Sequence, residues 1–136
     1  SELSQNARHR VMMWAGALAL ASLPIHYAMP PALSVQFASL MVALIAGVYA
    51  GFALNDGRLR IIILECAVAL LFFFAAALTL WFSKWIIPAL FALHGLWDIA
   101  HHRHISTKLP SWYPSLCAVF DWMIALGLSA IWLYAS

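Results

Sequence analysis

The stretch WIIPALFALHGLWDIAHHRHI, residues 85–105, decides how this chain folds. It begins as an apolar run and ends in histidines that surround a single acid. On a helix with Asp98 taken as zero, His94 falls at about −40°. His101 and His102 fall at about −60° and about +40° on the same scale. The sequence therefore predicts a membrane helix with one carboxylate and two or three imidazoles on one face.

The composition of the chain is typical of an integral membrane protein. Hydrophobic residues make up 65% of the 136 residues and charged residues only 9%, whereas a soluble domain carries roughly 25% charged residues. The formal net charge of +2 is too small to indicate a nucleic-acid partner. The lipid bilayer is therefore the expected partner of this chain.

Turn residues divide the chain into five apolar segments. Each segment approaches or exceeds the length needed to cross a hydrocarbon core of about 30 Å. We therefore expect an all-α integral membrane protein, a bundle of five transmembrane helices, with residues 1–136 forming a single membrane domain. The helices are expected at about residues 11–28, 33–54, 59–82, 85–105 and 115–135.

The basic residues predict the orientation of these helices. Lysine and arginine are enriched on the cytoplasmic side of membrane proteins. With the N-terminus in the cytoplasm, every Lys and Arg except Lys84 lies on that side. We therefore expect a cytoplasmic N-terminus and a C-terminus outside.

Three carboxylates fall inside the expected membrane helices, namely Glu65, Asp98 and Asp121. Each costs about 2.5–3.5 kcal/mol near the centre of a membrane helix, so their presence requires a reason. Each lies roughly 8–10 Å from the cytoplasmic end of its helix. This shared depth predicts that the bundle brings the acids together with the histidines of residues 85–105. Tyr49, with Trp97 or Trp122, is expected to pack against this region.

The residue types of this group predict a site for a divalent metal ion. Imidazole and carboxylate groups suit Zn or Fe, and the pattern does not select between them. Glu65 and Asp121 are the expected catalytic residues, as general acid/base groups or as further ligands. The expected metal ligands are His94, Asp98, His101 and His102. Alternatively, the acids and histidines pair with one another and hold no ion.

Two functions are compatible with such a site. The first is a metal-dependent enzyme, hydrolytic or oxidative, that acts on a lipid-like or isoprenoid substrate from the cytoplasmic leaflet. The alternative is a non-catalytic accessory subunit of a larger membrane complex, in which the polar residues form a structural or docking network. An oligomer or larger complex is also compatible with Gly47-x3-Gly51, a small face that allows close approach of a neighbouring helix.

The order of the polar residues resembles a family of small bacterial integral membrane proteins of uncharacterised function. The resemblance rests on Glu65, on His94-x3-Asp98-x2-His101-His102 and on Cys117-x3-Asp121, with GVYAGFAL at residues 47–54. It implies the bacterial inner membrane as the location, and it implies no activity.

Two shorter motifs resemble known membrane enzymes. Asp98-x2-His101-His102 is similar to the His-x2-His-His motif of membrane fatty-acid hydroxylases and desaturases, with Asp in place of the first His. That resemblance implies a di-iron site that would also need Glu65 and Asp121. His94-x3-Asp98 is similar to a motif of the ceramidase group of zinc hydrolases, which have seven helices rather than five.

Overall fold

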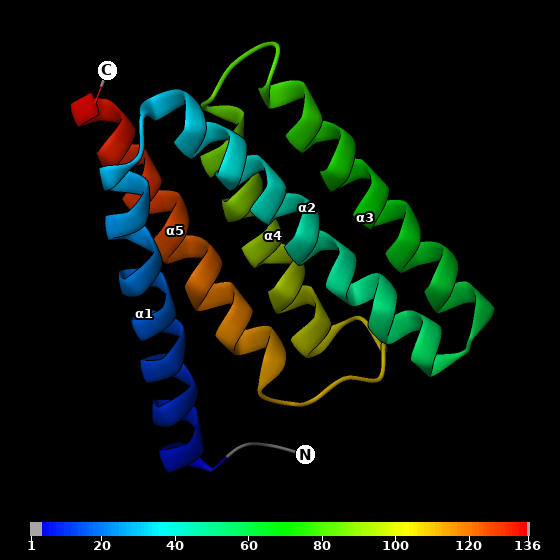
Figure 1. Cartoon of the computed structure of the whole chain (residues 1–136). Helices are drawn as coiled ribbons and strands as arrows, with labels where there is room; N and C mark the ends of the chain where they lie inside the picture. Colours follow the sequence, from blue (N-terminus) through cyan, green and yellow to red (C-terminus); the bar gives the residue numbers. More distant parts are fainter. Residues whose placement is uncertain (1–3, 136) are drawn as a thin grey trace.

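The computed structural model describes residues 4–135, and within this range the chain forms five α-helices and no strand. The helices are α1 (Gln5–Ala28), α2 (Pro31–Asp56), α3 (Leu59–Thr79), α4 (Ile86–Arg103) and α5 (Tyr113–Ala135). The predicted all-α fold is therefore confirmed. Successive helices run in opposite directions, so the start of α1, the α2–α3 turn and the α4–α5 loop lie at the same end of the bundle (Figure 1). Because this end carries every Lys and Arg except Lys84, we call it the basic end.

Local chemistry explains where the first helices begin and end. α1 begins at Gln5 because the side chain of Ser4 accepts a hydrogen bond from the backbone N–H of Ala7, at 3.1 Å. Pro31 occupies the first turn of α2, where its fixed φ suits a helix. α2 ends before Gly57, whose φ of 84° is a left-handed conformation that favours glycine.

Four of the five helices, α1, α2, α3 and α5, are long and apolar enough to span a membrane. α4 is not among them, because histidines, an aspartate and an arginine in its C-terminal half lower its mean hydropathy. Its 18 residues measure about 27 Å at 1.5 Å per residue. Its polarity rather than its length therefore sets it apart.

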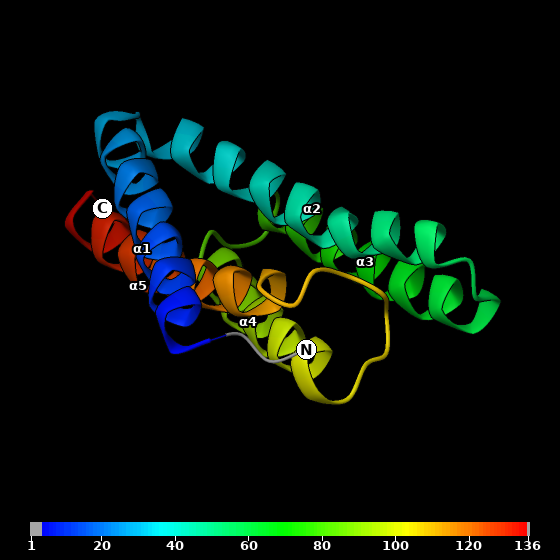
Figure 2. The ribbon, with the colours of Figure 1, turned by 90° about the horizontal axis from the view of Figure 1, so that it is seen from below.

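α4 contacts three other helices and leaves one face exposed, on which Leu93 and Leu96 are 53% and 58% exposed. Figure 2 shows α2 beside α3 and α1 beside α5, and α4 contacts α2 and α3 from the first pair and α5 from the second. Buried residues occur along α4 from Ile87 to His101. The packed face of α4 thus carries His94, Asp98 and His101 into the interior of the bundle.

The interior of the bundle has an apolar part and a polar part, which follow one another along its length. The apolar core includes Ile87 and Phe91 from the first half of α4, with Leu128 and Trp132 from the second half of α5. These residues lie toward the end opposite the basic end. The buried polar residues of α4 therefore lie between the apolar core and the basic end.

A close contact sets the separation of α4 and α5. The indole of Trp122 lies against Gly95, and its Nε1–H donates a hydrogen bond to the carbonyl oxygen of Ala92, at 3.1 Å. A side chain at position 95 would overlap this ring. Because Gly95 follows His94 and Trp122 follows Asp121, this contact also fixes the distance between those two polar residues.

Candidate functional site

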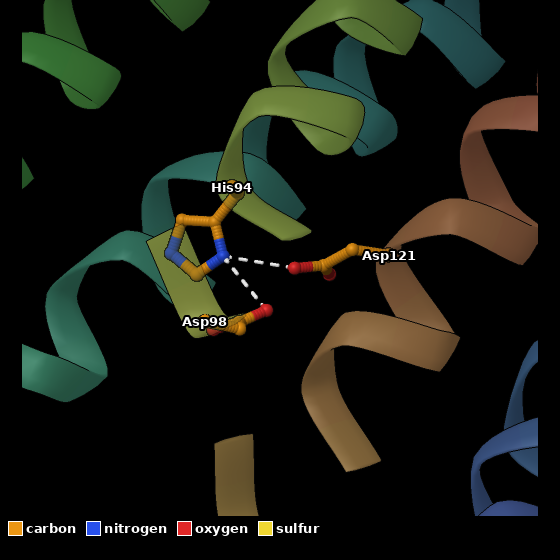
Figure 3. A group of neighbouring side chains, drawn as sticks. All are labelled: His94, Asp98 and Asp121. Atoms are coloured by element: carbon orange, nitrogen blue, oxygen red, sulfur yellow. Dashed lines mark hydrogen bonds and ion pairs between the residues drawn. The ribbon is translucent and has the colours of Figure 1, made fainter. Parts of the chain in front are cut away.

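His94 and Asp98 from α4 and Asp121 from α5 form a buried cluster, which we call the His94 group (Figure 3). The three residues have exposed fractions of 2%, 0% and 0%, respectively. Nδ1 of His94 lies 2.8 Å from Oδ2 of Asp121 and 3.6 Å from Oδ2 of Asp98. One ring nitrogen therefore faces two carboxylates, and one proton on it cannot neutralise both.

Three atoms of the His94 group have no hydrogen-bond partner within the described part of the chain. They are Nε2 of His94, Oδ2 of Asp98 and Oδ1 of Asp121. Unpaired polar atoms in a buried site are costly, and a buried excess of negative charge is more so. One ligand atom from each residue lies within 4.8 Å of the other two. The His94 group could therefore hold a metal ion, which would satisfy the carboxylates and balance their charge.

Tyr49 of α2 completes the wall of this site. Its hydroxyl donates a hydrogen bond of 2.5 Å to Oδ1 of Asp98, and its ring stacks on that of His101 with centroids 3.8 Å apart. Phe72 of α3 packs edge-on against His94 on another side. Asp98 is thus oriented by a second residue, as expected for a carboxylate that supports a metal ion.

Glu65 of α3 and His101 of α4 form a second buried cluster, which we call the Glu65 pair. Nε2 of His101 lies 2.5 Å from Oε2 of Glu65, and the hydroxyl of Thr107 donates to the same oxygen at 2.7 Å. Nδ1 of His101 lies 2.8 Å from the carbonyl oxygen of Trp97, which can only accept, so this nitrogen carries a proton. One further proton lies between Nε2 and Oε2, and with it the pair is neutral overall.

The bundle gathers most of the residues that the sequence singles out, but in two clusters rather than one. His94, Asp98 and Asp121 meet, so Asp121 lies among the candidate ligands. His101 instead contacts Glu65. His102 is exposed and joins neither cluster, because it lies at the level where a cavity rather than a packed helix faces α4.

This cavity, which we call the basic cavity, opens between the start of α1, the end of α4, the α4–α5 loop and the start of α5. Its volume is about 810 Å³. Residues that line it include Arg8, Met12, His101, His102, Arg103 and Thr107. His101 belongs to this lining, but its side chain and that of Glu65 are fully buried. The Glu65 pair therefore lies behind the wall of the cavity, and the His94 group lies deeper in the bundle.

Comparison with known proteins adds no relative. No family model, curated protein or solved structure matches this chain. The resemblances drawn from the sequence motifs therefore stay predictions, and the site is interpreted from its own geometry.

Thr107 is a site residue that the sequence analysis missed. It lies in the α4–α5 loop. The guanidinium of Arg58 holds this loop by donating a hydrogen bond of 2.5 Å to the carbonyl oxygen of Ser106, and it is itself held by hydrogen bonds of 2.7 and 2.8 Å to Asp56. Asp56 also accepts the backbone N–H of Lys108, at 2.8 Å. The hydrogen bond to Asp56 raises the pKa of Arg58 above its ordinary value. No motif marks Thr107, since only this fastened loop brings it to Glu65.

Proposed function

We propose that this protein is a membrane-embedded, metal-dependent hydrolase that acts on a lipid-like or isoprenoid substrate. The burial of the His94 group is the observation that carries the proposal, because it leaves two carboxylates and one imidazole without enough partners. A divalent cation held by His94, Asp98 and Asp121 would neutralise both acids. Zn²⁺ and Fe²⁺ both accept this set of nitrogen and oxygen donors.

The Glu65 pair supplies the proton transfer that hydrolysis needs. A divalent ion in the His94 group would contribute Lewis-acid chemistry. In this proposal the proton between Glu65 and His101 is the one transferred, and a substrate in the basic cavity would reach it only after the buried side chains behind the cavity wall move. Thr107 donates to Glu65 and holds it in place for this role.

The ligand set favours hydrolysis over oxidation. Non-haem iron oxygenases commonly use two imidazoles and one carboxylate, whereas the His94 group has one imidazole and two carboxylates. A di-iron centre would need further imidazoles, but His101 is engaged by Glu65 and His102 is exposed. The oxidative alternative therefore lacks the ligands that it would require.

In this proposal, all five helices cross the bacterial inner membrane, with the N-terminus in the cytoplasm and the C-terminus outside. The gathering of Lys and Arg at the basic end supports this orientation. The contacts of α4 with α2, α3 and α5 support its crossing, because they bury His94, Asp98 and His101.

The metal content of the purified chain, measured by plasma mass spectrometry, tests the proposal. We expect about one ion per chain for the unaltered protein, since structural and catalytic ions bind in defined sites. Asp98→Asn and Asp121→Asn should each lose most of the ion. Asp56→Asn is the matched control, because it removes a carboxylate outside the His94 group, and it should keep the ion.

Thermal unfolding of the same preparations separates loss of the site from loss of the fold. A folded Asp98→Asn protein without metal supports the proposal. Equal and negligible metal in all four proteins contradicts it and leaves the acids and histidines as a structural network.

A second candidate function, that of an accessory subunit, is supported by the surface of α2. Gly47 and Gly51 are exposed, and a side chain added at either would meet no atom within 4 Å. Such a face suits a helix of another chain. The polar residues themselves are buried within this chain, so they would stabilise such a subunit rather than dock it.

A further inference from the structure

We infer that the basic cavity binds the phosphate-bearing headgroup of an anionic lipid. The cavity lies at the end of the bundle where lipid headgroups would surround the protein, and its volume of about 810 Å³ is ample for a headgroup. It is built from segments distant in sequence, namely the start of α1, the end of α4 and the α4–α5 loop.

The charge of the cavity determines the kind of headgroup. Arg8 and Arg103 both line it, together with His102, and no acidic residue in the described range 4–135 does so. Within that range, neither arginine side chain has an ion-pair partner. Arg58, by contrast, is held by Asp56. Two unpaired guanidinium groups at one cavity suit a phosphate, which they bind through paired hydrogen bonds.

The remaining lining favours a lipid over free phosphate. Hydroxyl groups of Ser111 and Ser115 add hydrogen-bonding capacity near the arginines. Val11 and Met12 form an apolar side on α1, and Met12 is 53% exposed on the outer surface of that helix. A headgroup in the cavity can therefore extend an acyl chain along α1 into the bilayer. Basic pockets between membrane helices bind anionic headgroups in this way.

This inference names the class of substrate. It rests on the proposed function only for the claim that the bound lipid is also a substrate. His101 lines the cavity and carries the hydrogen bond to Glu65. A headgroup bound by Arg8 and Arg103 would therefore lie beside the part of α4 that carries His101, whose imidazole is buried against Glu65 behind the cavity wall. The binding itself does not depend on a metal ion and can be measured without one.

Binding of short-chain phosphatidic acid to the purified chain in a neutral detergent tests the inference, with apparent affinity taken from the ligand-dependent thermal shift. Arg8→Gln and Arg103→Gln should each weaken binding roughly tenfold or more, the effect of losing a charge-assisted hydrogen bond. Arg10→Gln and Arg60→Gln are the matched controls, since they remove the same charge at the same end but do not line the cavity. These two variants should bind as the unaltered protein does.

Three results would overturn the inference. Equal weakening in the control variants would show attraction to net charge only. Equal affinity for short-chain phosphatidylcholine would show no preference for an anionic headgroup. Displacement by an equal concentration of inorganic phosphate would identify free phosphate as the ligand.

The Asp98→Asn variant separates this inference from the proposed function. Retained lipid binding in Asp98→Asn supports the headgroup site whether or not a metal is found. A metal-containing protein that binds no phosphatidic acid would overturn the headgroup site and leave the metal proposal standing.

Discussion

At the residue scale, Tyr49 joins the two polar clusters of the bundle. Its hydroxyl donates to Asp98 of the His94 group, and its ring stacks on His101 of the Glu65 pair. The same side chain thus orients a candidate ligand and covers the buried imidazole of the Glu65 pair. A phenylalanine would keep the ring and remove only the hydrogen bond.

We expect Tyr49→Phe to weaken metal binding by roughly 10–100-fold, the usual effect of removing a residue that orients a ligand. Titration against a chelator of known affinity would measure this change. Tyr27→Phe is the control, because Tyr27 is 74% exposed and lies at the other end of the bundle. An unchanged metal affinity in Tyr49→Phe would mean that Asp98 is not a ligand.

The proton count of the Glu65 pair predicts different outcomes for two substitutions of Glu65. In Glu65→Gln, the amide can donate to Nε2 of His101 and to the hydroxyl of Thr107, so the free energy of unfolding should change by less than about 1 kcal/mol. Glu65→Ala leaves both partners unpaired and should cost about 1–3 kcal/mol. Unfolding in mixed micelles measures the free energy of unfolding of both variants. If Glu65→Gln lowered it as much as Glu65→Ala does, this proton count would be contradicted.

The sequence predicts the polar residues of the interior better than it predicts their pairing. Glu65, Asp98 and Asp121 stand out because a carboxylate at membrane depth is costly and needs partners. Which histidine meets which acid depends on how α3, α4 and α5 are rotated about their axes, and one sequence does not fix these rotations. Thr107 cannot be predicted as a site residue, because a hydroxyl in a loop is common and only the folded position of the loop brings it to Glu65.

At the scale of elements, the contact between α4 and α5 depends on the absence of a side chain at Gly95. Trp122 occupies the space that a methyl group at this position would need. An alanine would therefore push the two helices apart and draw Asp121 away from His94.

We expect Gly95→Ala to lower the free energy of unfolding by about 1–3 kcal/mol, the usual cost of overpacking. Gly47→Ala is the matched control, because position 47 faces open space and alanine favours a helix by up to about 1 kcal/mol. Thermal unfolding of both variants tests this expectation. Equal stability of the two proteins would show that α4 and α5 tolerate a wider separation.

The apolar segments predict the five helices, but helical angles alone misplace one residue. α1 begins at Gln5 rather than near residue 11, because Ser4 caps it, and α3 ends at Thr79 rather than near residue 82. His102 shares a predicted face with Asp98, yet it lies at the end of α4, beside the basic cavity. A helical angle describes one helix, whereas burial depends on whether a neighbour reaches that level.

At the scale of the whole molecule, the distribution of charge predicts the side of the membrane on which each end lies. We expect Lys84→Cys, made in a protein whose Cys66 and Cys117 have been replaced by alanine, to react with a membrane-impermeant maleimide in intact spheroplasts. Arg60→Cys in the same background should react with this maleimide only after the spheroplasts are lysed. The opposite pattern would reverse the orientation and place the basic cavity outside.

The polarity of α4 has a consequence for the order in which the protein is assembled. Aspartate and arginine strongly disfavour entry of an isolated helix into lipid during synthesis. α4 meets its main partner, α5, only after the ribosome has made α5. If α4 crosses the membrane as proposed, its insertion has to wait for α5, and a chain truncated before Tyr113 should leave its fourth segment outside the bilayer, exposed to quality-control proteases.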